Sequence, residues 1–320
     1  MALTLNDLFT SPNHYLHSFE GDDAVFVPMD RAAFHRSIFL DDRISVAADG
    51  SMRLPISALL GAEYTPQPLG WIFHMAHGGS TLLARALDGL ERNLILREPL
   101  ALRQLGLSPD AARLRVVRAM LGKRYLTNAP TIVKANVPVN FILPLLAALG
   151  ADDRAVFLYS GLREYLLAVL RTPQHRNWVS NVTSQLSPHF GDLSPLTDAQ
   201  RAAALWYFQM RAFAKAMAMI PGAASLDSEQ LFAQPHEALT AAATHLHVPI
   251  PAAQINDIVA GPIFNTYAKR PDIAFDNDTR EARRNQLERE IASELVEGVE
   301  WVEQQGDGKE VLDRPLLGIN

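Results

Sequence analysis

The chain has 320 residues, a formal net charge of -6 and no cysteine. This length can bury a large hydrophobic core, and it allows one large α/β domain or two smaller ones. The absence of cysteine excludes a disulfide scaffold and thiolate metal sites. The acidic balance, without any long run of lysine or arginine, argues against a general nucleic-acid-binding protein.

The N-terminal residues 1–23 contain no cationic start followed by an apolar stretch, so we expect no signal peptide. No run of about 18 apolar residues occurs in the chain, so we also expect no membrane span. A cytoplasmic location, with no membrane partner, is the resulting expectation.

Residues 1–67 are predicted to form an accessory segment that packs on the core. Residues 24–27 and 37–40 have strand-like composition, and Asp41 and Asp42 indicate a turn. The stretch 63–68 contains two prolines, which disfavour helix in the residue before them. It marks the entry to a main domain over residues 68–320.

From residue 70 onward, strand-like and helical patterns alternate, which predicts an α/β fold with a mostly parallel sheet covered on both sides. The expected strands are residues 71–75, 93–96, 131–134, 155–159 and 223–226. The expected helices are residues 82–87, 109–126, 141–149, 162–170, 197–219 and 235–247.

Two further stretches are interpreted by composition. Residues 178–196 show weak periodicity and several serines and prolines, which indicates a long loop of the kind that closes over a site. Residues 279–304 alternate charge and place Leu287, Ile291 and Leu295 near one face, which predicts a solvated helix docked on the core. The chain therefore ends in a helical C-terminal part.

A glycine-containing loop, His77 to Thr81, connects the first expected strand of the main domain to its helix. Glycines let a backbone turn sharply and approach a ligand, and the first turn of a helix presents unpaired N–H groups with a positive dipole. Phosphate or sulfate binding is one interpretation. A turn capped by Ser80 or Thr81, with no ligand, is the other.

Polar side chains follow four of the expected strands directly. They are His77, Glu98, Lys134 and Ser160. Because ligands bind at the carboxyl ends of parallel strands, we expect these residues to converge at one edge of the sheet.

At this point the chain resembles the sulfotransferase family of P-loop folds, over roughly residues 68–270. The loop 76–83 is similar to that family's 5′-phosphosulfate loop, and it lacks the Gly-Lys-Ser/Thr of an ATP-binding Walker A motif. Residues 131–136 resemble the strand that ends in Lys-Thr-His, 157–164 the Arg-Asp-Pro-Arg element, and 225–231 the Tyr-Glu-Asp-Leu segment. A P-loop-type three-layer fold is implied.

The resemblance implies transfer of a sulfonate from 3′-phosphoadenosine 5′-phosphosulfate, the donor, to a hydroxyl or amine of a small acceptor. Such a reaction needs cations and hydrogen-bond donors around the transferring anion, together with a base for the acceptor. No metal is expected. The partners implied are the nucleotide donor and the small-molecule acceptor, and a homodimer is left open.

Lys134 matches the family's lysine, and the resemblance gives it a catalytic role as the charge-neutralising cation. Glu98 is the candidate base, because it follows the second strand and precedes a proline that fixes the turn, and His77 is the third candidate catalytic residue. Simpler roles stay open: Lys134 at a strand end reaching water, and Glu98 capping a helix or pairing with Arg97 or Arg103. The implied donor-binding residues are His77, Gly78, Gly79, Ser80, Thr81, Ser160, Arg163, Lys269 and Arg270.

Four positions depart from the family pattern. His77 stands where the loop carries a fixed cation, Ser160 where an arginine holds the 3′-phosphate, Ala168 where a serine follows, and Asn136 where cytosolic members have a histidine. Two rival functions therefore stand beside the first: an ATP-dependent P-loop kinase-like phosphotransferase, and a non-catalytic nucleotide-binding or interaction protein of the same fold.

Overall fold

The computed structural model describes residues 3–89, 93–267, 270–274, 276–306 and 312–317. Its centre is a five-stranded parallel sheet with the order β5-β6-β4-β7-β8. The strands are β4 (Leu69–His74), β5 (Leu94–Arg97), β6 (Thr131–Lys134), β7 (Arg154–Tyr159) and β8 (Gly222–Asp227). The five strands predicted for the main domain are therefore confirmed.

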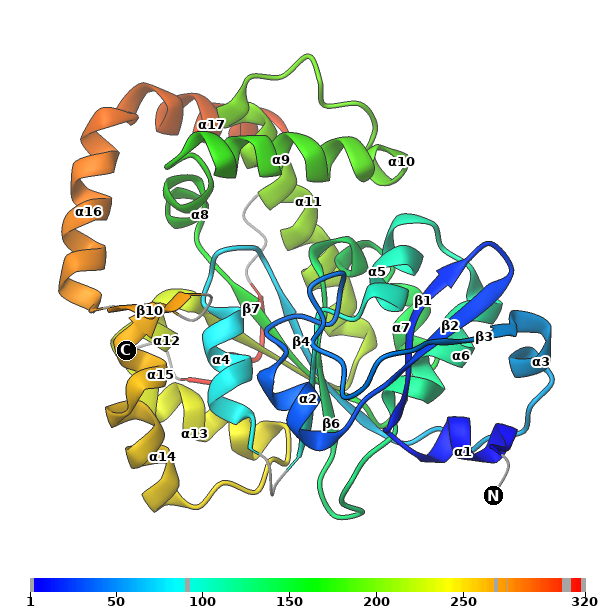
Figure 1. Ribbon diagram of the computed structural model, residues 1–320. Helices are drawn as coiled ribbons and strands as arrows, with labels where there is room; N and C mark the ends of the chain where they lie inside the picture. The colour runs from blue at the N-terminus through cyan, green and yellow to red at the C-terminus, as the bar shows by residue number, and fades with distance from the viewer. Residues whose placement is uncertain (1–2, 90–92, 268–269, 275, 307–311, 318–320) are drawn as a thin grey trace.

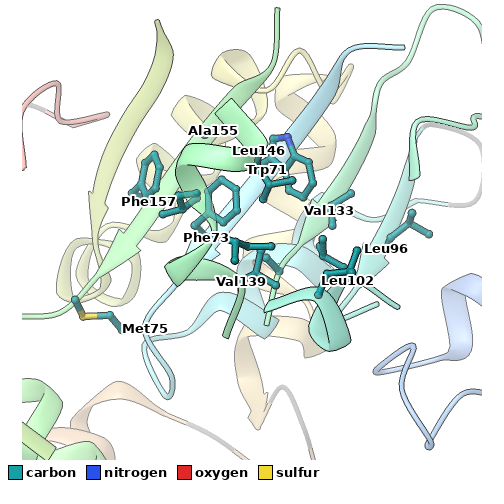
Figure 2. Packing of buried hydrophobic residues seen from close by; sticks show 14 of the residues in the cluster. Trp71, Phe73, Met75, Leu96, Leu102, Val133, Val139, Leu146, Ala155 and Phe157 are labelled. Carbon is teal, nitrogen blue, oxygen red and sulfur yellow. The ribbon is translucent and has the colours of Figure 1, made fainter. Parts of the chain in front are cut away.

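The central residues of the strands are buried, and most of them are apolar, because both faces of the sheet are covered. Alternate residues belong to different cores: Trp71 and Phe73 of β4 face one cluster, whereas Ile72 faces the other. On the first face, Phe73 stacks on Phe157 with ring centroids 5.2 Å apart (Figure 2). Each face buries a row of large side chains, which fixes the pairing register.

The helices cover the sheet in two layers (Figure 1). The second cluster packs α4 and α13 against the sheet, and the first packs the helices between β5 and β8, including α11. The predicted three-layer α/β fold is confirmed. The helices of these layers are α4 (Ser80–Leu87), α5 (Leu100–Leu107), α6 (Ala111–Leu121), α7 (Leu143–Ala147), α8 (Leu162–Val169), α11 (Asp198–Met219), α12 (Ser228–Ala233), α13 (Pro235–His245) and α14 (Ala252–Ala260).

The N-terminal residues form a separate antiparallel sheet with the order β1-β2-β3. The strand expected at 24–27 lies within β2, whereas the strand expected at 37–40 is absent. Carbonyl oxygens of Phe34 and Ser37 instead accept hydrogen bonds from the buried Arg97 guanidinium, at 2.8 and 3.0 Å, which holds this segment beside β5. The elements are α1 (Leu5–Thr10), β1 (His14–Glu20), β2 (Asp23–Pro28), α2 (Arg31–Arg36), β3 (Met52–Pro55) and α3 (Ile56–Leu60).

The expected loop at 178–196 is wrong. Helix α9 (Pro173–Gln185) and the short α10 (Ser187–Phe190) occupy most of it. Thr172 caps α9 by accepting from the His175 amide, and Pro173 occupies the first turn, where its missing N–H costs nothing. The apolar Trp178 and Val182, four residues apart, face inward, and polar residues between them concealed the helical period.

The C-terminal part is helical, as expected, but it is two helices rather than one. They are α16 (Asn277–Glu290) and α17 (Ala292–Gln304), with Ile291 at the junction. Between α14 and α16 lie α15 (Pro262–Asn265), β9 (Thr266–Tyr267) and β10 (Arg270–Ala274), and a 3₁₀ turn (Val137–Phe141) follows β6. Within the described residues, no helix is long and apolar enough to cross a membrane.

Candidate active site

A cavity of about 1100 Å³ opens along the carboxyl edge of the sheet. His77, Glu98, Lys134 and Ser160 all line it, so the structure brings together the four polar residues that follow successive strands. The sheet order places Glu98 and Lys134 at one end, the glycine loop in the middle and Ser160 towards the other end. Helices α8, α9 and α16 supply the walls above this edge.

Lys134 and Glu98 form an ion pair across neighbouring strands. Lys134 ends β6 and is 1% exposed, so a lysine that reaches water is excluded. Burial lowers the pKa of Lys134, and the Glu98 carboxylate opposes that shift. Asn136 donates to the other Glu98 oxygen at 3.3 Å, so the carboxylate is held by two side chains from the β6 end.

Glu98 is placed by an unusual backbone. Its φ is 57°, a left-handed conformation that is costly for a residue with a side chain. The Glu98 amide donates to the Lys134 carbonyl at 2.8 Å, and Pro99 then begins the turn into α5. Glu98 pairs with Lys134 and not with Arg97, whose guanidinium binds Asp88 at 3.1 Å.

The glycine loop turns sharply into α4. His77 and Gly79 have φ values of 66° and 83°. Gly79 is the N-cap of α4, and no side chain caps the helix, so the interpretation of a turn capped by Ser80 or Thr81 is wrong. The first amides of α4 have no carbonyl one turn earlier to receive them. His77, Gly79, Ser80 and Thr81 line the cavity.

The two glycines of the loop are packed closely against side chains that follow β7 and β8. A Cβ on Gly78 would lie 3.1 Å from the Ser160 Oγ, and a Cβ on Gly79 would lie 3.0 Å from the Phe232 ring. Ser160 and Ser228 share a hydrogen bond of 2.8 Å between their hydroxyls. Close approach therefore favours glycine at both positions, and the left-handed backbone favours it at Gly79 as well.

His77 faces α9 across the cavity. Its ring lies 4.5 Å from the His175 ring and 5.3 Å from the Trp178 ring, measured between centroids. His175 is fixed by Thr172, whose hydroxyl lies 2.5 Å from its Nδ1, and by Arg171. The segment expected to be a loop thus supplies one wall of the site.

The structure separates Arg163 from the cavity. Its guanidinium pairs with Glu288 of α16 and with Glu164, at 2.9 Å for the latter, and its side chain is 43% exposed. Lys269 lies outside the described residues. The backbone of Arg270 begins β10 and pairs with Tyr267.

Arg280 and Arg284 of α16 are cavity residues that the sequence analysis did not single out. Both donate to the Glu229 carboxylate, and Arg284 also reaches Glu164 at 3.2 Å. Arg280 lies over the Phe232 ring, 4.0 Å from its centroid. Their spacing of four residues, continued by Leu287, was a usable signal for one shared helix face.

No group of three or more potential metal ligands occurs among the described residues. His245 instead lies within hydrogen-bond distance of the Ala155 and Gly222 carbonyls, at 3.2 and 3.0 Å, and burial lowers its pKa. His245 therefore has a structural role at the sheet.

The first strand of the main domain, β4, lies at the centre of the sheet, and an uncapped glycine loop connects it to α4. Together with the polar residues at the carboxyl edge of the sheet, this arrangement defines a P-loop-type three-layer α/β protein. Two solved structures are similar to it. One is described as the sulfotransferase domain from the curacin biosynthetic pathway, with 12% identity, 65% of this chain and 83% of that chain covered, and a TM-score of 0.42. The other is a sulfotransferase from Alicyclobacillus acidocaldarius, with 12% identity and a TM-score of 0.40. The similarity covers 75% of this chain and 96% of that chain. No protein-family model matches the chain. No curated protein matches it either.

Proposed function

We propose that this protein is a sulfotransferase that moves a sulfonate from 3′-phosphoadenosine 5′-phosphosulfate to a hydroxyl or amine of a small acceptor. The observation that carries the proposal is the presence, in one cavity, of an uncapped helix start at Gly79 and a held Lys134–Glu98 pair. The first feature binds an anion and the second can neutralise charge and accept a proton.

The donor's 5′-phosphate fits the loop. The amides that begin α4 and the hydroxyls of Ser80 and Thr81 supply hydrogen-bond donors on the cavity side. A side chain at Gly78 or Gly79 would crowd Ser160 or Phe232, so the loop presents its backbone at these two positions. His77, in the left-handed conformation at the loop, adds a donor that is positively charged when protonated.

The adenosine and its 3′-phosphate fit the end of the cavity over β7 and β8. Arg280 and Arg284 provide the fixed positive charge there, in place of Arg163, and the Phe232 ring offers apolar surface to a base. Glu229 now holds both guanidinium groups. Arg284 also contacts Glu164. A phosphate carrying two negative charges competes with these two carboxylates for planar, bidentate donors.

At the other end, the acceptor oxygen attacks sulfur, a new S–O bond forms, and the bond from sulfur to the 5′-phosphate oxygen breaks. The acceptor proton passes to the Glu98 carboxylate, and adenosine 3′,5′-bisphosphate leaves. Lys134 neutralises the charge on the transferring group. Because Asn136 and Lys134 both hold Glu98, the carboxylate is positioned before substrate arrives.

The test is turnover of the donor by the full chain. We expect release of adenosine 3′,5′-bisphosphate from the phosphosulfate, measured by chromatography, to accelerate when a panel of phenols, alcohols and amines is added, and a sulfonated product 80 mass units heavier to form. Phosphorylation from ATP with Mg²⁺ in the same panel, without sulfonation, would assign the protein to kinase-like transfer instead. Absence of both reactions would favour the non-catalytic alternative.

A further inference from the structure

The two ends of the cavity differ in what they offer. Arg280 and Arg284 lie on α16, whereas Glu98 and Lys134 lie at the far end of the sheet, beside α5. In Figure 1, α16 and α5 are on opposite sides of β4. With the donor over β7 and β8, the end beside α5 is left for the acceptor.

Charges at this acceptor end do not cancel. Arg43 pairs with Asp41, with 2.9 Å between Nε and Oδ1, and Lys134 pairs with Glu98. Arg103 of α5 is the third cation on this part of the lining. Three cations against two carboxylates leave one positive charge in excess.

Arg103 lines the cavity, and the acidic group that feels its charge is Asp41, which is itself paired with Arg43. Among the described residues, no carboxylate lies within ion-pair distance of its guanidinium, and its contact is the Gln185 amide oxygen at 3.5 Å. The side chain is partly buried, so its hydration is incomplete. A partly desolvated arginine with a neutral neighbour gains most from a planar anion that accepts two hydrogen bonds.

Apolar side chains surround this charge. Phe39, Val137 and Val182 line the same part of the cavity, and all three are buried. The Phe39 ring lies beneath Arg43, 3.9 Å from the guanidinium carbon. An acceptor that fits has an apolar body with one anionic group.

We propose that the acceptor is a hydroxycarboxylate, whose carboxylate is bound by Arg103 while its hydroxyl lies at Glu98. This inference rests on the proposed function. The two charges also orient the acceptor, because its carboxylate is repelled by the Glu98 carboxylate and attracted by the Arg103 guanidinium. Arg103 is thus a specificity residue and takes no part in the bond changes.

The test uses a panel of aromatic and aliphatic hydroxy acids, each with its methyl ester, titrated into protein saturated with adenosine 3′,5′-bisphosphate. We expect the best acid to bind about tenfold more tightly than its ester, as a charge-assisted bidentate contact provides. Arg103→Gln should remove that difference by weakening the acid alone, and Arg103→Lys should restore part of it. Arg115→Gln, an exposed position outside the cavity, should change neither.

Each outcome decides one point. If the wild-type protein binds the bisphosphate but no acid binds better than its ester, or if Arg103→Gln leaves the preference intact, the hydroxycarboxylate acceptor is wrong and the sulfotransferase proposal stands. If the bisphosphate itself does not bind, the sulfotransferase proposal fails and this inference fails with it. If Arg103→Gln misfolds and loses bisphosphate binding, the test uses the ratio of acid to ester affinity in the wild type and in Arg103→Lys. A smaller ratio in Arg103→Lys supports the proposal, and an equal ratio contradicts it.

Discussion

The Lys134 ammonium is buried against the Glu98 carboxylate where two neighbouring parallel strands end. The backbone of Glu98 is left-handed, and its amide donates a hydrogen bond to the Lys134 carbonyl at 2.8 Å. A buried ion pair is a poor source of stability, because desolvation offsets most of the attraction. Its position on a cavity wall is more readily explained by chemistry at that wall.

Replacing Glu98 by glutamine tests its role as the base. The amide keeps an oxygen that can accept from Lys134, but it cannot take a proton. It also leaves the buried Lys134 ammonium without a counter-charge, so we expect urea unfolding to show a loss of about 3 kcal/mol as well. We expect turnover of the phosphosulfate to fall by roughly 10²- to 10⁴-fold, the usual contribution of a positioned base. Affinity for adenosine bisphosphate should be unchanged, since the proposed nucleotide site is at the other end of the cavity.

The companion variant Lys134→Met tests the other member of the ion pair. It leaves Glu98 without its cation, which we expect to cost about 3 kcal/mol in urea unfolding in addition to lost turnover. A Glu98→Gln protein with full turnover would remove Glu98 from the mechanism.

Alanine at Gly79 should both destabilise the protein and weaken bisphosphate binding. Gly79 has φ 83°, and its added Cβ would lie 3.0 Å from Phe232. The matched control is Gly21→Ala, with φ 60° and nothing within 4 Å of the added atom. We expect the control to lose about 1 kcal/mol from backbone strain, and Gly79→Ala roughly 1 to 3 kcal/mol more from crowding. Equal losses in denaturant unfolding, with binding intact, would contradict this account of the loop.

The arginines of α16 should control nucleotide affinity. We expect Arg280→Gln and Arg284→Gln each to weaken adenosine bisphosphate about tenfold, because each removes a charge-assisted contact to phosphate. Binding should also become less sensitive to salt. Arg289→Gln, on the same helix but exposed and outside the cavity, is the control. Arg163→Gln should have no effect, and a strong effect there would restore the assignment made from sequence.

Lys123 predicts a pH dependence of stability. Burial lowers the pKa of Lys123 from 10.5 to about 7, and its ammonium contacts the Leu8 and His14 carbonyls. Between about pH 7 and pH 10.5 the unfolded chain binds a proton that the folded chain releases, so stability rises with pH. The lysine contributes a slope of up to about 1.4 kcal/mol per pH unit.

The measurement is urea unfolding of the wild type and Lys123→Met at several pH values across that interval. We expect the difference between their unfolding free energies to change with pH, whereas Lys215→Met, at an exposed position, should follow the wild type. Parallel curves for the wild type and Lys123→Met would show that Lys123 keeps an ordinary pKa.

The sheet could be predicted because its physics is local. Residues 71–73 and 155–159 are continuous apolar runs, which are typical of strands in a sheet buried on both faces. The rule that ligands bind at strand ends then placed Glu98 and Lys134 on one edge. It could not predict their pairing, because the left-handed turn at Glu98 depends on the neighbouring strand.

The walls of the cavity could not be predicted in this way. Helix α9 hides its apolar face among polar residues, so residues 178–196 resembled a loop. Arg163 follows a strand, as expected of a site residue. Its guanidinium nevertheless binds Glu288, 125 positions later in the chain, and lies outside the cavity. Arg280 and Arg284 are held at the cavity by Glu229 of α12, and Arg284 also by Glu164 of α8. Such long-range placement is absent from local sequence patterns.

The most direct test of the central proposal is isothermal titration calorimetry of the full chain with adenosine 3′,5′-bisphosphate, with 5′-AMP, and with ATP plus Mg²⁺. We predict that the bisphosphate binds with one-to-one stoichiometry and more tightly than 5′-AMP, because the proposal assigns the 3′-phosphate to Arg280 and Arg284. We also predict that ATP with Mg²⁺ fails to displace it. Binding of ATP with Mg²⁺ alone, with no heat from the bisphosphate, would contradict the assignment of this site to sulfonate transfer.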